Sequence, residues 1–294
     1  METFIQYSIV GLLEGGLYAL VGVTIVLVYK STHVASIAHG HIMAFGALFL
    51  YVFYSVLGLW LILALVLTFA ATCLLGLAME RVALRPLIGQ PHFAAFLLTF
   101  ALFLGLDGIF NIVLGGTVID FPNFLPVGNF KLAGANVPYG QFVSFISALF
   151  LFGLLGLFFR ITKVGLNMLA TAENHELAQS TGISVKKVFS FAWGLSALVA
   201  AVAGMATANV MDISFPLPYM VIKGLVVALF GGLDSIVGAL VGGLVLGILE
   251  NVAAGYIDPL VGGGVKDVAA YFMLLLILLV RPYGLFGQAR IERI

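Results

Sequence analysis

Four ionisable residues stand within long apolar runs of the sequence: Glu14, Asp107, Lys223 and Glu250. A charge at the centre of a membrane helix costs about 2.5–3.5 kcal/mol on insertion scales, so such a side chain normally faces protein or water. Each of the four could line a solute path, and each could equally join two helices by pairing. Asp107 and Asn111, one helical turn apart, favour pairing. Glu14 precedes Gly15 and Gly16, where another backbone can approach, and we give the two roles equal weight there.

Histidines in a broken apolar run offer a second kind of chemistry. Residues 31–40 and 231–235 interrupt apolar runs, and a span that breaks there would present a helix end to a substrate. His39 and His41 lie in and after the first break, but two histidines with no third ligand nearby are weak evidence for a metal. We therefore expect no metal site and interpret both histidines as lining a path.

Signatures of catalysis are missing from the sequence. It contains no GxxxxGK[ST] phosphate loop, no HExxH and no GxSxG. Its one cysteine, Cys73, excludes a disulfide framework and every multi-cysteine metal site. We expect no catalytic residue and no cofactor, so any energy from ATP must come from another polypeptide.

The elements that must position these residues are membrane helices. Of 294 residues, 62% are hydrophobic and 9% charged, against about 25% charged in soluble domains. The 13 basic and 13 acidic residues cancel, so net charge gives no reason to expect a nucleic-acid partner. A span needs about 20 apolar residues, fewer where it is broken. The runs that fit are 4–29, 42–56, 57–79, 93–114, 140–160, 188–210, 219–230, 236–253 and 268–280.

These runs predict an all-α fold, a single polytopic transmembrane bundle over residues 1–294 with about eight to ten helices. Runs 42–56 and 219–230 are short, and we expect incomplete spans there. The first run follows Glu2 and contains no Lys or Arg, which favours a retained helix over a cleaved signal peptide. Small residues at four-residue spacing favour close helix packing; they are Gly11, Gly15 and Gly16, then Gly238, Gly242, Gly243 and Gly247.

Basic residues orient the bundle. If the N-terminus is outside, ten of them fall on one side of the membrane, and the positive-inside rule makes that side the cytoplasm. The ten are Lys30, Arg81, Arg85, Arg160, Lys163, Lys186, Lys187, Arg281, Arg290 and Arg293. Lys131 and Lys266 fall on the other side. The C-terminus is therefore expected inside.

Two loops stand out from the apolar background. Residues 161–187, on the inner side, form the longest polar run, in which 172–181 can form a surface helix that ends at Gly182. Ser184 can then cap the next helix. Considered alone, this loop is better interpreted as a solvated connector than as a docking site. Residues 115–139, outside, predict a small ordered cap with a hairpin turn at Gly128 and Asn129.

Short motifs run through the whole chain. They are Gly11 with Tyr18-Ala19-Leu20, Ala38-His39-Gly40 with Gly46-Ala47, Arg85-Pro86-Leu87, Ala170-Thr171-Ala172, Thr181-Gly182-Ile183, Lys223, Gly231-Gly232 with Ser235, Gly242-Gly243 to Glu250, Lys266-Asp267, and Arg281-Pro282 with Gly284-Leu285. Each is short, but together and in this order they resemble the integral-membrane permease subunit of the branched-chain amino acid ABC importers, the H-type member of the pair.

This resemblance implies one transmembrane half of a bacterial importer that moves branched-chain amino acids or a related small amphipathic solute across the inner membrane. It also implies a second permease subunit, either an M-type homologue or a copy of this chain, two separate ATPases, and a periplasmic binding protein. Residues 115–139 are then a periplasmic loop and 161–187 a cytoplasmic coupling loop. The residues expected to contact an ATPase are Ala172, Glu173, Asn174, His175, Glu176, Leu177, Ala178, Thr181 and Gly182.

Departures from the family pattern bear on the substrate. Ser36-Ile37 stands where the family usually has Asn-Phe, and Asp234 stands where it usually has Gly. An uncharged residue is usual in place of Glu14, and a small or acidic one is frequent in place of His41. These changes put a leucine-type substrate in question and leave the transport class intact. The residues assigned to the substrate path are Glu14, Ser36, His39, His41, Lys223, Asp234 and Glu250.

One alternative comes from a different class of protein. A self-sufficient channel or secondary transporter would use the four intramembrane charges as a ladder for an ion or a small polar solute. Uptake by the chain alone would distinguish this alternative from an importer subunit.

Overall fold

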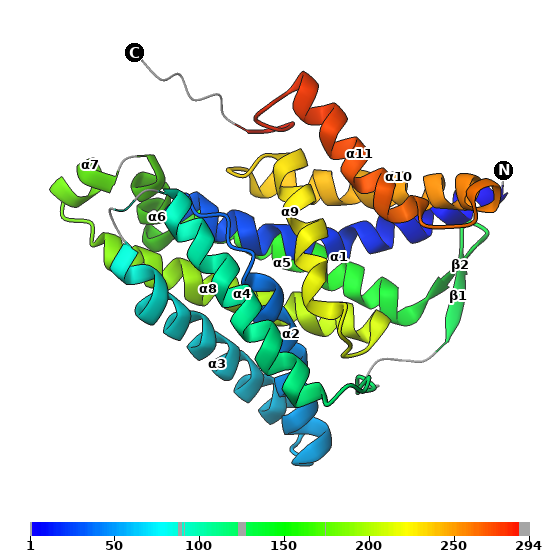
Figure 1. Cartoon of the computed structure of the whole chain (residues 1–294), viewed down its shortest axis with the longest axis horizontal. Coiled ribbons are helices and arrows are strands. Elements are labelled where there is room, and N and C mark those ends of the chain that lie inside the picture. The colour runs from blue at the N-terminus through cyan, green and yellow to red at the C-terminus, as the bar shows by residue number, and fades with distance from the viewer. Residues whose placement is uncertain (1, 88–89, 91, 123–127, 174, 288–294) are drawn as a thin grey trace.

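The computed structural model describes residues 2–87, 90, 92–122, 128–173 and 175–287, and these are mostly helical (Figure 1). The α-helices are α1 (Glu2–Thr32), α2 (His39–Tyr51), α3 (Leu61–Met79), α4 (His92–Leu114), α5 (Tyr139–Ile161), α6 (Lys163–Glu173), α7 (His175–Ser180), α8 (Val185–Met211), α9 (Met220–Gly231), α10 (Ile236–Val261) and α11 (Val265–Val280). Irregular helical turns lie at Val52–Val56, Glu80–Leu84, Arg85–Leu87 and Leu217–Tyr219. A hairpin of β1 (Asn129–Leu132) and β2 (Ala135–Pro138) lies between α4 and α5.

Each of the nine apolar runs coincides with a helix, which confirms the all-α polytopic bundle. Within the described ranges, seven helical segments are long and apolar enough to cross a membrane: Glu2–Thr32, His39–Val56, Leu61–Leu87, Phe93–Leu114, Tyr139–Ile161, Val185–Met211 and Ile236–Val261. The helical segment at 42–56 is longer than its apolar run, because the helix already begins at His39 and reaches 18 residues. The run at 219–230 is short as expected, since α9 has only 12 residues.

α1 runs through the middle of the molecule, in contact with α5, α8, α9 and α10 (Figure 1). It buries most of its residues, as α8 does, whereas α3, α4 and α5 bury only a minority of theirs. On these outer helices, Ile112 is 81% exposed and Phe150 is 67% exposed. Apolar surface of this extent is suited to contact with lipid.

Glycines let α1 and α10 pack with their backbones in contact. A Cβ atom added at Gly11 would lie 2.5 Å from the carbonyl oxygen of Gly247, and one added at Gly15 would lie 2.6 Å from that of Gly243. Real Cβ atoms essentially never approach so closely. The small-residue spacing noted in the sequence is therefore confirmed as a packing face.

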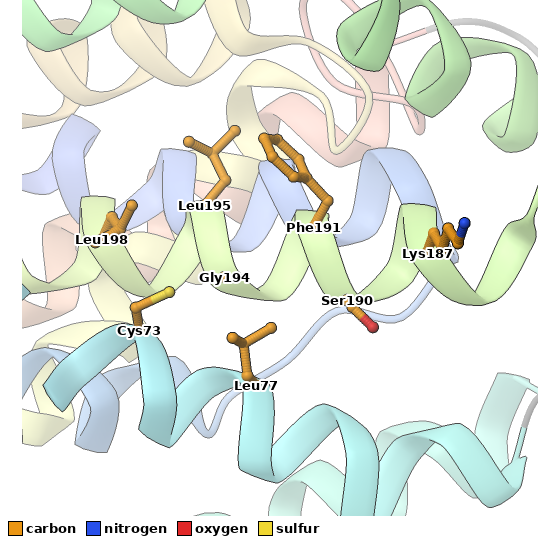
Figure 2. Close-up of a pocket in the computed structure, with 8 residues that line it drawn as sticks. All are labelled: Cys73, Leu77, Lys187, Ser190, Phe191, Gly194, Leu195 and Leu198. Atoms are coloured by element: carbon orange, nitrogen blue, oxygen red, sulfur yellow. The ribbon is translucent and has the colours of Figure 1, made fainter. Parts of the chain in front are cut away.

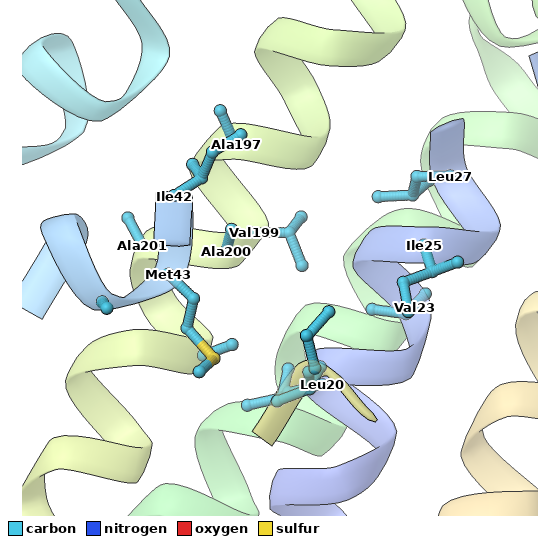
Figure 3. Packing of buried hydrophobic residues seen from close by; sticks show 14 of the residues in the cluster. Leu20, Val23, Ile25, Leu27, Ile42, Met43, Ala197, Val199, Ala200 and Ala201 are labelled. Carbon is cyan, nitrogen blue, oxygen red and sulfur yellow. The ribbon is translucent and has the colours of Figure 1, made fainter. Parts of the chain in front are cut away.

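The core continues where α1, α2 and α8 meet (Figure 3). There α8 supplies the small side chains of Ala197, Ala200 and Ala201, and α2 supplies the larger Ile42 and Met43. Large side chains opposite small ones fill the space between helices without voids. α2 is thereby fixed against α8.

α2 and α9 begin inside the bundle. Between α1 and α2 the chain is not helical, and Val34, Ser36 and Ala38 are buried at every second position. Gly40 then lies against the carbonyl oxygen of Pro218, just before α9, where a Cβ would collide. The N-terminal ends of these two helices therefore meet in the interior, the arrangement expected of broken helices.

The outer-loop hairpin packs beside the start of α1. Gln6 on α1 exchanges two hydrogen bonds with the backbone of Asn136 on β2, at 2.7 and 3.0 Å. The predicted turn at Gly128 and Asn129 was wrong, because the strands turn at Ala133 and Gly134, whose φ angles are +51° and +87°. Two left-handed central residues match the twist of a two-residue hairpin, and glycine tolerates that conformation.

The polar inner loop contains two helices instead of the single helix expected over 172–181. α6 begins earlier because Thr162 accepts a hydrogen bond from the backbone N–H of Gly165 at 3.0 Å, as a helix cap does. α7 ends at Ser180, and Gly182 follows it in the predicted left-handed conformation, with a φ of +88°. Ser184 stands at the start of α8, but its side chain makes no capping hydrogen bond.

Candidate functional site

A cluster of charged side chains joins α1, α9, α10 and α11. On one side of it, the Lys223 ammonium on α9 lies 3.0 Å from Glu250 Oε2 on α10 and 3.1 Å from Asp267 Oδ1 on α11. On the other side, Glu14 Oε2 on α1 accepts hydrogen bonds from Lys266 Nζ and from Asn251 Nδ2. These six residues, Glu14, Lys223, Glu250, Asn251, Lys266 and Asp267, are called the charge cluster below.

Burial varies across the charge cluster. The Glu250 side chain is 0% exposed and the Asp267 side chain is 74% exposed, with the two lysines and Glu14 between these extremes. Within the described residues, Glu250 Oε1 is buried without a hydrogen-bond partner. Three carboxylates face two ammonium groups, so the cluster has a formal charge of −1 when all are ionised. It can therefore accept a further cation or hydrogen-bond donor.

Neighbouring glycines position the two lysines of the charge cluster, Lys223 and Lys266. Lys223 lies one residue before Gly224, at which α9 approaches α1, and its ammonium stands 5.2 Å from the Tyr18 ring centre. Three consecutive glycines, 262–264, all have positive φ and turn the chain sharply between α10 and α11. The carboxylate of Asp258 then accepts the first free N–H of α11, from Val265, at 2.9 Å. This turn directs Lys266 to Glu14.

The cluster includes three residues that were not assigned to the path from the sequence: Asn251, Lys266 and Asp267. Lys266 and Asp267 form a charged pair immediately before an apolar run, and that position is the signal that could have identified them. Three of the predicted path residues, Glu14, Lys223 and Glu250, do meet here.

His41 belongs to a separate polar group. Its Nε2 atom lies 3.1 Å from Asp107 Oδ1 on α4, and Asn111 donates to Asp107 Oδ2 at 3.0 Å, so the expected pairing of Asp107 with Asn111 is confirmed. The rings of Phe103 and Phe110 flank the imidazole edge-on. This group joins α2 to α4, and a role for His41 in the path stays a prediction.

Ser36 and His39 lie buried at the start of α2. In the described part of the chain, neither Ser36 Oγ nor either ring nitrogen of His39 has a hydrogen-bond partner. The His39 ring packs against Trp193, with 4.7 Å between the ring centres. Buried polar groups are nearly always paired, so these atoms mark a place where a solute, a water or another conformation would supply partners.

Asp234 lies far from the charge cluster. It stands in the turn between α9 and α10, where its backbone oxygen accepts a hydrogen bond from Lys30 Nζ at 3.1 Å. Along α10, the helix that begins beside it, Glu250 is about 20 Å away, since an α-helix rises about 1.5 Å per residue. The structure thus places Asp234 at the end of α1 nearest the polar inner loop.

The predicted coupling residues occupy α6, α7 and the turn after them. His33, at the end of α1, donates from Nε2 to the backbone oxygen of Ala172 at 2.6 Å. Leu177 is 64% exposed, whereas Ala178 is buried and accepts a hydrogen bond from Thr181. Glu173 is exposed. Asn174 lies outside the described residues, and His175 and Glu176 are described only as the first residues of α7.

Metal-binding groups do not gather in the described ranges, where no three His, Cys, Asp or Glu side chains could hold one ion together. His39 and His41 have different neighbours. His39 packs against Trp193, and His41 lies beside Asp107. Their geometry accordingly offers no shared ligand position.

Comparisons with known proteins agree with this architecture. The family model described as "Branched-chain amino acid transport system / permease component" matches residues 8–280. The chain is 27% identical to the high-affinity branched-chain amino acid transport system permease protein LivH of Escherichia coli, covering 99% of this chain and 98% of that protein.

Two further relatives show similar coverage. The permease protein BraD of Pseudomonas aeruginosa, named for the same kind of transport system, is 28% identical over 99% of this chain and 98% of its own length. A probable branched-chain amino acid transport permease protein LivH of Methanocaldococcus jannaschii is 29% identical over 94% of this chain and 90% of its own length. Since the family model matches nearly all of its apolar helices, the chain is a multi-pass membrane protein that belongs to the family of branched-chain amino acid transport permease components.

Proposed function

We propose that this chain is the transmembrane permease subunit of an ATP-binding cassette importer that moves branched-chain amino acids or a related small amphipathic solute. Family membership and the names of the relatives support this role. The structural observation that carries it is the charge cluster, which lies among four helices and opens from buried Glu250 to exposed Asp267.

The chemistry of the charge cluster suits a zwitterion. A free amino acid has an ammonium group and a carboxylate. The charge cluster contains lysine ammoniums and side-chain carboxylates, so a bound amino acid could replace one partner in each of their ion pairs. Glu250 Oε1, which has no hydrogen-bond partner among the described residues, adds an acceptor for an ammonium group. Such replacement keeps every charge paired, which lowers the free-energy cost of moving a zwitterion through the bundle interior.

The two ends of the molecule indicate where its partner proteins would bind. The hairpin lies with the N-terminus at one end and α6 and α7 lie at the other (Figure 1). We place the N-terminus and residues 115–139 in the periplasm, next to a periplasmic binding protein. The C-terminus and residues 161–187 are cytoplasmic, next to two ATPase subunits, and a second permease subunit completes the path in the inner membrane.

The mechanism couples a loop to a helix. ATP binding on the partner ATPases moves α6 and α7, and the hydrogen bond from His33 to Ala172 transmits this movement to α1. Because α1 carries Glu14, a shift of α1 changes the pairing within the charge cluster. The permease supplies a path and two conformations, and no covalent bond is made or broken in it.

The test is uptake of radiolabelled leucine, isoleucine and valine into liposomes that contain the chain, its ATPases, the second permease subunit and the binding protein. We expect uptake that requires ATP and all of the partners. Uptake by the purified chain alone would overturn the proposal and favour a self-sufficient channel. ATP-driven uptake of none of the three amino acids would exclude branched-chain amino acids as the solute and leave a related small amphipathic solute.

Glu14 offers a matched variant for this assay. Glu14→Gln removes the charge that pairs with Lys266 while retaining an acceptor for Asn251. We expect a lower rate or a changed preference among the amino acids, with unchanged binding of the ATPases. As a control, Lys131→Gln alters an exposed charge on the hairpin and should leave transport unchanged. Wild-type kinetics for Glu14→Gln would give Glu14 a packing role only.

A further inference from the structure

A groove lies on the outer surface between α3 and α8, outside the charge cluster (Figure 2). It has a volume of about 360 Å³, within the usual range of small-molecule sites. Cys73 and Leu77 on α3 line it, together with Gly194 and Leu198 on α8, and Phe191 and Leu195 line it from the side of α8 that is turned away from α3. The groove is partly open to the outside, and its lining is almost entirely apolar.

One end of the groove is polar and basic. Lys187, in the first turn of α8, and Ser190 line it there (Figure 2). Within the described part of the chain, no carboxylate lies within 4.0 Å of the Lys187 ammonium. Lys186 and Arg81 are also exposed near these helix ends. The apolar groove thus ends at a cation that lacks a counter-charge.

The neighbouring acid is already neutralised. Glu80 is buried, and both of its carboxylate oxygens accept hydrogen bonds from Arg85, at 2.9 and 3.1 Å. Arg85 also donates to Ser190 Oγ at 2.6 Å, which fixes the guanidinium at the edge of the groove. Because Glu80 is paired, the basic end keeps a positive charge that favours an anion.

The length of the groove corresponds to one leaflet of a bilayer. Lys187 and Leu198 are separated along α8 by about 16 Å, since an α-helix rises about 1.5 Å per residue. The hydrocarbon core of a bilayer is about 30 Å thick, so one leaflet accounts for about 15 Å. The apolar walls therefore match the acyl region of a single lipid, and Lys187 stands at headgroup depth.

From this match of length, polarity and charge we propose that the groove is a binding site for an anionic phospholipid. One acyl chain lies in the groove along the surface of α8, beside α3, and the phosphate of the headgroup pairs with Lys187 beside Ser190. Basic groups between membrane helices at the headgroup level are suited to anionic lipids, whereas a zwitterionic lipid gains little from the uncompensated cation. The occupied groove would hold α3, an outer helix, against α8, a core helix.

The experiment measures retained lipid by native mass spectrometry. The full-length chain in mild detergent is incubated with equal amounts of phosphatidylglycerol and phosphatidylcholine that have the same acyl chains. We expect the wild type to retain phosphatidylglycerol over phosphatidylcholine by about fivefold, the factor that corresponds to about 1 kcal/mol per basic residue at a membrane surface. Lys187→Gln should bring the ratio close to one.

A matched control separates the groove from general positive charge. Lys163→Gln removes an exposed cation on α6, at the same end of the molecule and outside the groove, and should leave the ratio unchanged. Equal retention of the two lipids by the wild type would overturn the proposal. An equal fall of the ratio in both variants, or no fall in Lys187→Gln, would overturn it as well.

Filling the groove gives an independent test. A Cβ added at Gly194 would lie 3.5 Å from both Cys73 Sγ and Leu77 Cδ2, which is ordinary contact, so Gly194→Ala should fold and retain lipid. Gly194→Leu places a larger side chain in the lining of the groove and should lose the phosphatidylglycerol preference, with the helical content measured by circular dichroism unchanged. If Gly194→Leu instead converts a dimer to monomers with lipid retention unchanged, the groove is an interface between copies and the proposal fails.

Discussion

Lys223 and Glu250 pair in the interior, and the two residues depend on each other. Glu250 is fully buried and Lys223 is its ion-pair partner. Removing one partner of a buried pair leaves an uncompensated charge and typically costs about 3–5 kcal/mol. We expect Lys223→Met to lower the free energy of unfolding by this amount, and the double variant Lys223→Met/Glu250→Gln to recover most of it. Equilibrium unfolding in mixed micelles measures the difference.

The control for this prediction is a lysine without a buried partner. Lys131 is exposed on β1, so Lys131→Met should change the free energy of unfolding by less than about 0.5 kcal/mol. Equal losses in the single and the double variants would show that the ion pair makes no net contribution, and the Lys223 stem would then act by packing alone.

At the level of single residues, the sequence identified charges better than it identified their partners. Glu14, Lys223 and Glu250 stand out because charges are rare inside apolar runs. Lys266 lies at the end of a run, and its contact with Glu14 depends on the turn that three glycines form. The isolation of Ser36 and His39 could not be predicted either, because it depends on which helices surround them.

The crossing of α1 and α10 depends on the absence of side chains. A Cβ added at Gly247 would lie 2.5 Å from the Gly15 backbone, so Gly247→Ala must separate the two helices. Overpacking of this kind typically costs about 1–3 kcal/mol. We expect Gly247→Ala to lower the thermal unfolding temperature in detergent. Gly153→Ala, on the exposed face of α5 with nothing within 4 Å, should leave it unchanged. Equal behaviour of the two variants would contradict a close crossing.

His33 joins the end of α1 to the end of α6. Its hydrogen bond to the backbone of Ala172 links an element of the core to the polar inner loop. We expect His33→Ala to lower the amount of solute transported per ATP hydrolysed by the assembled complex, without preventing ATPase binding. His33→Gln, which retains a long side chain with an N–H donor, should preserve more of the coupling. A parallel loss of hydrolysis and transport in both variants would indicate a defect of assembly instead.

At the level of elements, long apolar runs were predicted correctly and short polar segments were not. Hydropathy places the spans because lipid excludes unpaired backbone groups and accepts only helices there. In the inner loop, Thr162 caps the start of α6, and the amino-acid composition did not indicate a helix there. The hairpin turn was misplaced because both Gly128 and Gly134 tolerate positive φ, and strand register alone decides between them.

The two ends of the molecule provide a test of orientation. In a Cys73→Ser background, we expect a cysteine at Lys131 to react with an impermeant maleimide in spheroplasts whose inner membrane is intact. A cysteine at Lys163 should react only after that membrane is permeabilised. Both positions are exposed, on the hairpin and on α6. The reverse pattern would invert the membrane orientation, and labelling of both without permeabilisation would contradict opposite sides.

For the whole molecule, the sequence predicted the family and the number of apolar segments, but not which helix is central. Ordered motifs sufficed for the family, and the family model now confirms it. The central position of α1 depends on its contacts with α8, α9 and α10, which come late in the chain. Glycine spacing indicated faces for close packing, but it did not indicate that α1 and α10 pack against each other.

The crossing of Gly11 and Gly15 with Gly243 and Gly247 also governs how the protein is made. α1 leaves the ribosome before α10, and this helix, which covers the glycine face of α1, is synthesised more than 200 residues later. Until then, the nascent chain must shelter that face in the translocon or against a chaperone of the membrane. A chain truncated before α10 would therefore insert its earlier helices and leave Gly11 and Gly15 of α1 uncovered.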